Sequence, residues 1–99
     1  MSKINKSDYI KISRTLVKKL YDETCFGKGS LYIDSLKKGI PKEDIGSIEE
    51  IMESLVKQKI CGKKKKEHGW KYYLNIERLD KIKEIIKEKG GVSLLLFLL

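Results

Sequence analysis

The feature that most constrains the fold is a stripe of apolar residues at helical spacing in the middle of the chain. Its members are Ile48, Ile51, Met52, Leu55 and Val56. This spacing predicts an amphipathic helix that buries the stripe and runs to about Gln58. The start of the helix has two alternatives, because Pro41 disfavours helical dihedrals at Ile40, whereas Ser47 opens an S-x-x-E capping box.

Three elements are predicted before this central helix. A first helix begins behind a capping Ser7 or Asp8 and ends near Thr24, where a loop with two glycines follows. Its apolar positions are Ile12, Leu16, Val17, Leu20 and Tyr21. Residues 31–38 are then predicted to form a brief strand and a short helix that ends at Gly39.

A β-hairpin is predicted after the central helix. Short strands at Ile60–Cys61 and at residues 70–74 flank the segment 62–69, which we expect to be a polar loop with four successive lysines. The period of two divides the second strand into two faces. One face carries Trp70, Tyr72 and Leu74, and the other carries Lys71 and Tyr73. The first face is expected to touch the core, so Trp70 is interpreted as a core anchor rather than as a platform for base stacking.

The helical period returns after the hairpin and predicts a helix over residues 76–90, which Gly90 and Gly91 end. Its apolar positions are Ile76, Leu79, Ile82, Ile85 and Ile86. Two roles stay open for this helix: an additional cover for the core, or a seam between two copies of the chain. In the apolar tail, residues 91–99, the run 92–99 would span only about 12 Å as a helix against a hydrocarbon core of about 30 Å. No transmembrane segment is therefore predicted. Three roles stay open for the tail: burial in a dimer, which we expect, addition to a sheet, or contact with a membrane surface beside the lysines.

The charge of the chain points to a polyanionic partner. Lysine and arginine outnumber aspartate and glutamate by 22 to 14, which gives a net charge of +8. A surplus of this size favours nucleic acid or an acidic membrane surface. Residues 42–56 carry one cation and five anions, whereas residues 57–71 carry seven cations and one anion. The polyanion is therefore expected to meet the hairpin.

Several function classes lack the residues that they need. The first residues hold no apolar segment typical of a secretory signal, so a cytoplasmic location is expected. Cys25 and Cys61 are too far apart for a C-x-x-C metal site and the lone His68 does not complete a zinc set, so no cofactor is expected. Both thiols are expected to be reduced and semi-buried. Without a glycine-rich phosphate loop or a nucleophile–base set, the chain is not expected to be an enzyme.

The predicted order of helix, short strand, short helix, longer helix, hairpin and helix resembles the winged helix-turn-helix family of DNA-binding proteins, as found in small prokaryotic, archaeal or viral regulators. The apolar pattern of that family is matched at Ile48, Met52, Leu55 and the pair Ile60–Cys61, and residues 72–74 resemble its return strand. The resemblance implies an α+β fold with a three-helix core and a β-hairpin wing over residues 1–75. A C-terminal helix at residues 76–90 and the apolar tail at 91–99 would follow.

Two positions depart from the pattern of this family. The residue just before the wing's first strand, commonly a glycine, is Lys59 here. The segment between Gly39 and Ile48 is also a few residues longer than a tight turn. The longer segment leaves open the angle between the second and third helices.

In winged-helix proteins that bind DNA, the third helix commonly enters the major groove while the wing contacts backbone or minor groove. Here the outward face of the third helix carries two glutamates, which would meet phosphates unfavourably. That face is expected to consist of Glu43, Ser47, Glu50, Ser54 and Lys57. We therefore expect the wing to lead the contact and the helix to add specificity. The expected DNA-binding residues are Lys63, Lys64, Lys65, Lys66, His68, Lys71, Lys57, Ser47 and Lys42.

The resemblance thus predicts a transcription regulator or nucleic-acid accessory factor that binds double-stranded DNA, as a homodimer joined through the C-terminal helix and tail. Basic residues of the first helix would extend the surface if their side lies beside the wing. They are Lys11, Arg14, Lys18 and Lys19. Two alternatives stay open: the lysine run is only a solvated turn, or the acidic third helix makes the domain a protein–protein interaction module within a larger complex.

Overall fold

The computed structural model describes residues 5–87, which form an α+β fold of four α-helices and one three-stranded antiparallel sheet. The α-helices are α1 (Lys6–Asp22), α2 (Ile33–Lys37), α3 (Ile48–Lys57) and α4 (Leu79–Lys87), with 3-10 helices η1 (Lys42–Ser47) and η2 (Ile76–Arg78). The strands are β1 (Leu31–Tyr32), β2 (Cys61–Lys66) and β3 (Gly69–Leu74), in the spatial order β1-β3-β2.

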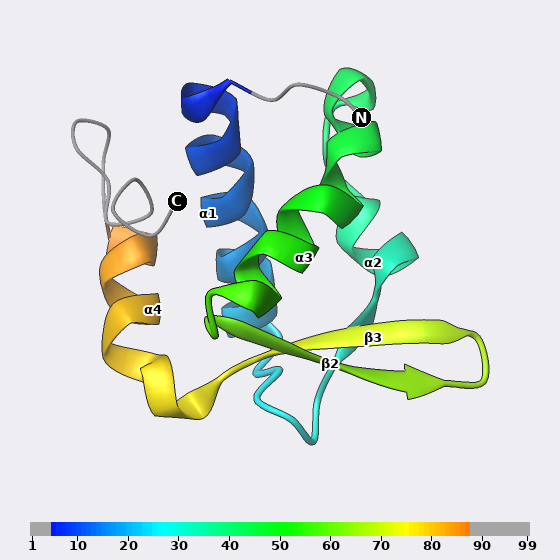
Figure 1. The fold of residues 1–99 in the computed structure, drawn as a ribbon, viewed down its shortest axis with the longest axis vertical. Helices are drawn as coiled ribbons and strands as arrows, with labels where there is room; N and C mark the ends of the chain where they lie inside the picture. The colour runs from blue at the N-terminus through cyan, green and yellow to red at the C-terminus, as the bar shows by residue number, and fades with distance from the viewer. Residues whose placement is uncertain (1–4, 88–99) are drawn as a thin grey trace.

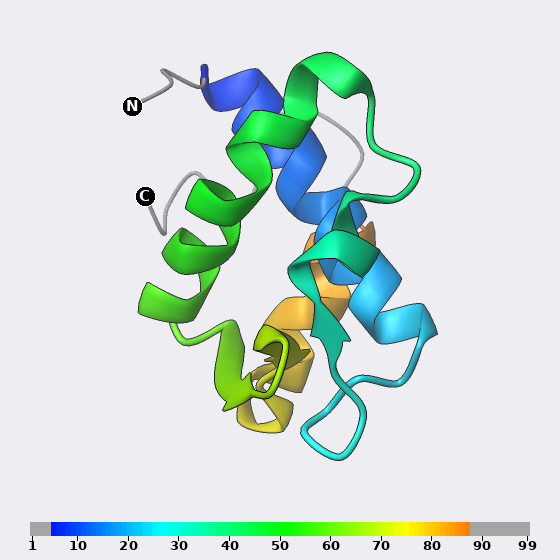
Figure 2. The same ribbon diagram turned by 90° about the vertical axis from the view of Figure 1, so that its right-hand side faces the viewer.

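The hairpin of β2 and β3 lies across one end of α1 and α3 (Figure 1). Its tip extends past α2, and α4 stands at the opposite side of the molecule (Figure 1). Figure 2 looks at the molecule from the side of the hairpin tip, with α2 and α3 next to each other above it. The distal part of the hairpin therefore projects from the body of the helices.

The core lies between α1, α3, α4 and one face of the sheet. The stripe of α3 is inside, since Ile48, Ile51, Met52 and Leu55 are fully buried while Val56 is half-buried. The burial of this stripe confirms the predicted amphipathic helix. Two isoleucines of α4, Ile82 and Ile85, are also fully buried and cover the same core.

The start of α1 differs from the prediction. Asn5 caps the helix, because its Oδ1 accepts a hydrogen bond of 2.8 Å from the backbone N–H of Asp8. Ser7 and Asp8 therefore lie inside the first turn, and neither is the cap. The physical reason is that Tyr9 is already buried, so the core-facing side of the helix begins a turn before Ile12.

The two longest helices end in the same way, with a residue in the left-handed region that is not glycine. At the end of α3, the N–H of Lys59 donates to the carbonyl of Val56 and the N–H of Ile60 donates to that of Leu55, each at 3.0 Å. Lys59 has a φ of 68° there. Thr24 has a φ of 53° at the equivalent position after α1. A glycine would adopt this conformation without strain. Lys59 departs from the winged-helix pattern in residue type, but it has the backbone conformation that the glycine common at this position favours.

The segment before α3 uses both predicted starts in part. The 3-10 helix η1 begins directly behind Pro41, and α3 begins at Ile48 after Ser47. The Ser47 side chain makes no capping hydrogen bond, so the predicted capping box is wrong. An N-cap needs extended dihedrals, whereas Ser47 continues from η1 with φ −94° and ψ −10°.

The predicted polar loop of the hairpin is also wrong. The four lysines from Lys63 to Lys66 form the second part of strand β2, and the turn consists only of Glu67 and His68. Each lysine is paired in register with a residue of β3, from Lys63 opposite Tyr72 to Lys66 opposite Gly69. The lysine run has little β propensity of its own. It forms a strand because it pairs with β3, whose residues favour the strand conformation.

Helix α4 covers one side of the core. Its buried isoleucines fit a cover for the core, whereas Ile76, just before it in η2, is 55% exposed. The predicted dimer seam stays a prediction, and residues 88–99, which include the apolar tail, lie outside the described residues. Within residues 5–87, no helix combines the length and the hydropathy that crossing a bilayer requires.

Candidate nucleic-acid interface

The register of the sheet sorts the lysines onto two faces, because residues that lie directly opposite each other point to the same side. We call one side the outer face, which turns away from the core. It consists of Lys64, Lys66, Lys71, Tyr32 and Tyr73. We call the other side the inner face, which continues from the buried side of the sheet toward the hairpin tip. It consists of Lys63, Lys65, Trp70 and Tyr72.

The outer face places cations side by side without a matching anion. Lys64 and Lys71 are direct cross-strand partners, and Lys66 follows two residues further along the same strand. None of these three lysines takes part in an ion pair within the part of the chain that the structure describes. Like charges directly opposite each other destabilise a sheet, so this face has an electrostatic cost that a bound polyanion would relieve.

Aromatic rings and a neighbouring loop support these lysines. The Lys71 ammonium lies 4.8 Å from the centroid of the Tyr32 ring, and the Lys64 ammonium lies 5.9 Å from that of Tyr73. Lys64 also donates a hydrogen bond of 2.6 Å to the carbonyl of Gly27, in the loop after α1. The Tyr73 ring packs over Gly62, where an added Cβ would lie 2.6 Å from ring atoms. The ammonium groups are therefore positioned by contacts from β1, β3 and this loop.

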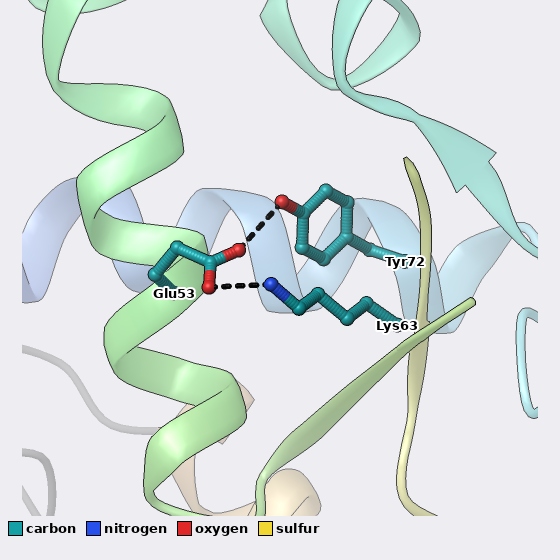
Figure 3. Close-up of polar contacts among 3 residues, drawn as sticks. All are labelled: Glu53, Lys63 and Tyr72. Carbon is teal, nitrogen blue, oxygen red and sulfur yellow. Dashed lines mark hydrogen bonds and ion pairs between the residues drawn. The ribbon is translucent and has the colours of Figure 1, made fainter. Parts of the chain in front are cut away.

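On the inner face, one carboxylate joins the hairpin to α3. Glu53 accepts a hydrogen bond of 2.7 Å from the Lys63 ammonium at Oε1 and one of 2.9 Å from the Tyr72 hydroxyl at Oε2 (Figure 3). The hydrogen bond from Lys63 is the main reason that the pKa of Glu53 is lowered. Burial raises the pKa of Tyr72, and the hydrogen bond to Glu53 raises it further. The pair is therefore held as a carboxylate and a neutral phenol at neutral pH.

Trp70 is not the core anchor that the sequence predicts. Its side chain is 41% exposed, whereas Tyr72 and Leu74 on the same face are buried. The reason is that the hairpin extends past the helices, so the alternation of faces continues where no core remains. The ammonium groups of Lys63 and Lys65 lie 4.5 Å and 5.3 Å from the centroid of the indole ring. Trp70 is thus an exposed aromatic ring flanked by cations.

The exposed side of α3 is more acidic than predicted. Ser54 is half-buried and shares a hydrogen bond of 2.8 Å with the Tyr9 hydroxyl of α1, so it does not belong to the outward face. Glu49 and Glu53 are exposed in its place. A cleft of about 670 Å³ separates these glutamates and α2 from the inner face of the hairpin. Lys63 is the lysine of β2 that lines this cleft, and its ion pair with Glu53 connects the two walls.

The structure brings only some of the predicted site residues together. His68 lies in the turn next to the lysines, with its ring 6.2 Å from that of Tyr32 in an edge-to-face contact. Lys57 is exposed at the end of α3 that leads into the hairpin. Lys42 and Ser47 belong to η1, which precedes α3 and lies at the end of that helix away from the hairpin (Figure 1). These two residues are therefore separate from the basic surface.

The basic residues of α1 serve other contacts. Arg14 donates to the carbonyl of Ile85 in α4 at 3.2 Å, and Lys18 pairs with Asp22 at 2.9 Å. Lys19 donates to the carbonyl of Lys38 at 2.8 Å. None of these three hydrogen bonds joins α1 to the hairpin.

Sequence reasoning missed Glu53 and Tyr32 as parts of the interface. The spacing of Glu49 and Glu53 by four residues places them on one edge of α3, which was a usable signal. The contact between Glu53 and Lys63, however, depends on the hairpin register and on the angle at which the hairpin leaves α3. Tyr32 reaches the outer face only because β1 pairs with β3, with Tyr32 opposite Lys71.

The two cysteines are free and buried. Burial raises the pKa of Cys61 to about 12, and burial is also the main reason that the pKa of Cys25 is raised. Both thiols are therefore protonated at neutral pH and are weak nucleophiles. Among residues 5–87, no group of three or more potential ligands is placed to hold a metal ion.

A comparison with known protein families, with curated protein sequences and with solved structures found no match. A function is therefore inferred from the fold and from the two faces of the hairpin.

Proposed function

We propose that this chain is a winged-helix DNA-binding protein, in which the hairpin is the wing and leads the contact with the phosphate backbone. The observation that carries the proposal is the outer face, where Lys64, Lys66 and Lys71 stand together without carboxylate partners among the described residues. The element order α1-β1-α2-α3-β2-β3 and the sheet order β1-β3-β2 are consistent with the resemblance to winged-helix proteins.

The geometry of a two-stranded ribbon suits phosphate binding. Residues two apart on one strand are separated by about 6.5 Å, which is close to the spacing of successive phosphates along a nucleic-acid strand. Lys64 and Lys66 on β2 can thus follow one backbone while Lys71 on β3 approaches it from the side. Such contacts release counterions and carry little base selectivity.

The acidic surface of α3 limits its role in the complex. Glu49 and Glu53 lie on its exposed side, so insertion into the major groove would bring carboxylates toward phosphates. We infer that α3 adds selectivity only where a glutamate accepts from a cytosine amino group, and that the protein acts as a transcription regulator or accessory factor. A homodimer through the C-terminal helix and tail is part of this proposal and is tested by a measurement of molecular size.

The test compares two variants of equal charge. Changing Lys64, Lys66 and Lys71 to glutamine removes the outer-face cations, whereas changing Lys6, Lys11 and Lys38 to glutamine removes three exposed lysines from α1 and from the segment after α2. At low salt we expect the first variant to bind random duplex DNA at least about tenfold more weakly than the native chain, and the second to bind almost as well. Equal losses in both variants would mean that net charge, and not the hairpin, is responsible.

A second candidate function rests on the acidic residues of η1 and α3. Glu43 and Glu49 are exposed there, and this surface would suit a basic protein partner. In that case the domain would be an interaction module within a larger complex. The absence of duplex affinity at low salt would favour this function over DNA binding.

A further inference from the structure

Trp70 is the feature of the hairpin that phosphate binding does not use. It is the only tryptophan of the chain and is 41% exposed, on the inner face near the hairpin tip. Burying an indole normally stabilises a fold, so a large ring left in solvent between Lys63 and Lys65 is available for a ligand. An exposed ring beside a row of cations is the arrangement on which unpaired nucleobases stack.

The ring also borders the cleft between the hairpin and the helices. This cleft has a volume of about 670 Å³, which is within the usual range for sites that hold a small organic molecule. Its lining includes Ile33 and Asp34 of α2, Glu49 and Glu53 of α3, and Lys63 and Trp70 of the hairpin. One wall is therefore aromatic, and the opposite wall carries carboxylates.

The charges around the cleft give a bound nucleotide one orientation. Glu53 is already occupied by Lys63 and Tyr72, whereas Asp34 has no polar partner among the described residues and Glu49 has only a long contact of 3.9 Å with Lys37. A phosphate would be repelled by Asp34 and Glu49. A base that carries an exocyclic amino group can instead donate to these carboxylates, while its phosphate stays outside near Lys65 and Lys66.

We infer that the cleft holds one unpaired nucleobase stacked on Trp70, so that the chain prefers DNA with a single-stranded segment to blunt duplex DNA. Cytosine, adenine and guanine are preferred over thymine, because each of the three carries an exocyclic amino group that can donate to Asp34 and Glu49. A paired base is stacked on both sides and its amino group is engaged, so it does not enter the cleft. This inference rests on the proposed DNA binding and names the structural form of DNA that the same hairpin selects.

The experiment uses two DNAs with the same number of phosphates. Both consist of one duplex with a single-stranded extension, made of deoxycytidine in one DNA and of abasic residues in the other. We expect the native chain to bind the deoxycytidine extension about tenfold more tightly than the abasic one. Trp70→Ala should lose this preference and keep the affinity for the abasic DNA, while Tyr73→Ala, which alters the outer face, should keep the preference.

Fluorescence gives a second readout that does not depend on affinity alone. Because Trp70 is the only tryptophan, stacking of a base should quench the emission of the native chain with the deoxycytidine extension and leave it almost unchanged with the abasic one. Equal affinity of the native chain for the two DNAs, or an equal loss for both in Trp70→Ala, would overturn the inference and leave the lysine-led binding in place. Absence of binding to either DNA at low salt would instead overturn the proposed function itself.

Discussion

At the scale of single residues, Glu53 determines how the hairpin is joined to α3. Its two oxygens accept from Lys63 and from Tyr72, so one side chain connects the third helix to both long strands (Figure 3). The ion pair also occupies Lys63, which leaves the other three lysines of the run for a ligand. The sequence alone does not show which of these four lysines point toward α3 and which point away from it, whereas the register of the sheet does.

The lowered pKa of Glu53 makes its contribution to stability dependent on pH. The contribution is complete above the ordinary carboxyl pKa of 4.5 and is lost as the pH falls through the lower value in the folded protein. Since the side chain is 48% exposed, we expect Glu53→Gln to lower the free energy of unfolding by less than about 1 kcal/mol at neutral pH. Urea unfolding should show this difference shrinking as the pH falls below 4.5 and disappearing once the pH lies below the lowered pKa of Glu53.

The matched control for this prediction is a double-mutant cycle with Lys63→Gln, in which the effect of Glu53→Gln should shrink. A difference that grows as the pH falls would contradict the assignment of a lowered pKa to Glu53.

The left-handed conformation of Lys59 leads to a second prediction at this scale. A lysine with a φ of 68° carries a strain of roughly 1–2 kcal/mol, which glycine avoids at a smaller cost in chain entropy. Lys59→Gly should therefore raise the free energy of unfolding by up to about 1 kcal/mol in urea titrations. Lys57→Gly, two residues earlier at the last residue of α3, should lower it by up to about 1 kcal/mol. A loss of stability in Lys59→Gly would show that the lysine side chain, rather than the backbone, matters at this position.

At the scale of elements, the hairpin is where prediction from the sequence was least complete. The helices are predictable from the sequence because most residues of an apolar stripe of period 3.6 are buried, as in α3. A run of lysines has no hydrophobic periodicity, so its sequence pattern predicts a loop at Lys63 to Lys66. The strand there depends on pairing with β3, which the run itself does not encode. The period of two predicted correctly that Trp70 shares a face with Tyr72. It could not tell how far the core extends along that face, and for this reason the exposure of Trp70 was missed.

The short turn of the hairpin can be tested through Gly69. This glycine has a φ of 119°, a region that other residues rarely adopt, and nothing lies within 4 Å of an added Cβ. Gly69→Ala should therefore lower the free energy of unfolding by about 1–3 kcal/mol through backbone strain alone. Gly46→Ala is the control, since Gly46 has equally open space without a positive φ and should be neutral or slightly more stable. Equal stability of Gly69→Ala and the native chain would contradict the two-residue turn.

At the scale of the whole molecule, opposite charges are divided between the hairpin and the segment that precedes it. Residues 57–71 carry seven cations and one anion, and residues 42–56 carry one cation and five anions. The fold places the distal hairpin away from η1, and the ion pair of Glu53 and Lys63 joins the two charged regions where they meet (Figure 1). This division favours the proposed orientation, in which the hairpin, and not α3, would approach a polyanion.

The salt dependence of duplex binding tests hairpin-led binding most directly. The slope of log K against log salt concentration falls by about 0.9 for each phosphate contact that is lost. Changing Lys64, Lys66 and Lys71 to glutamine should therefore make the slope shallower by about 2–3, and the matched variant at Lys6, Lys11 and Lys38 should keep the native slope. A native slope in the hairpin variant would contradict hairpin-led binding.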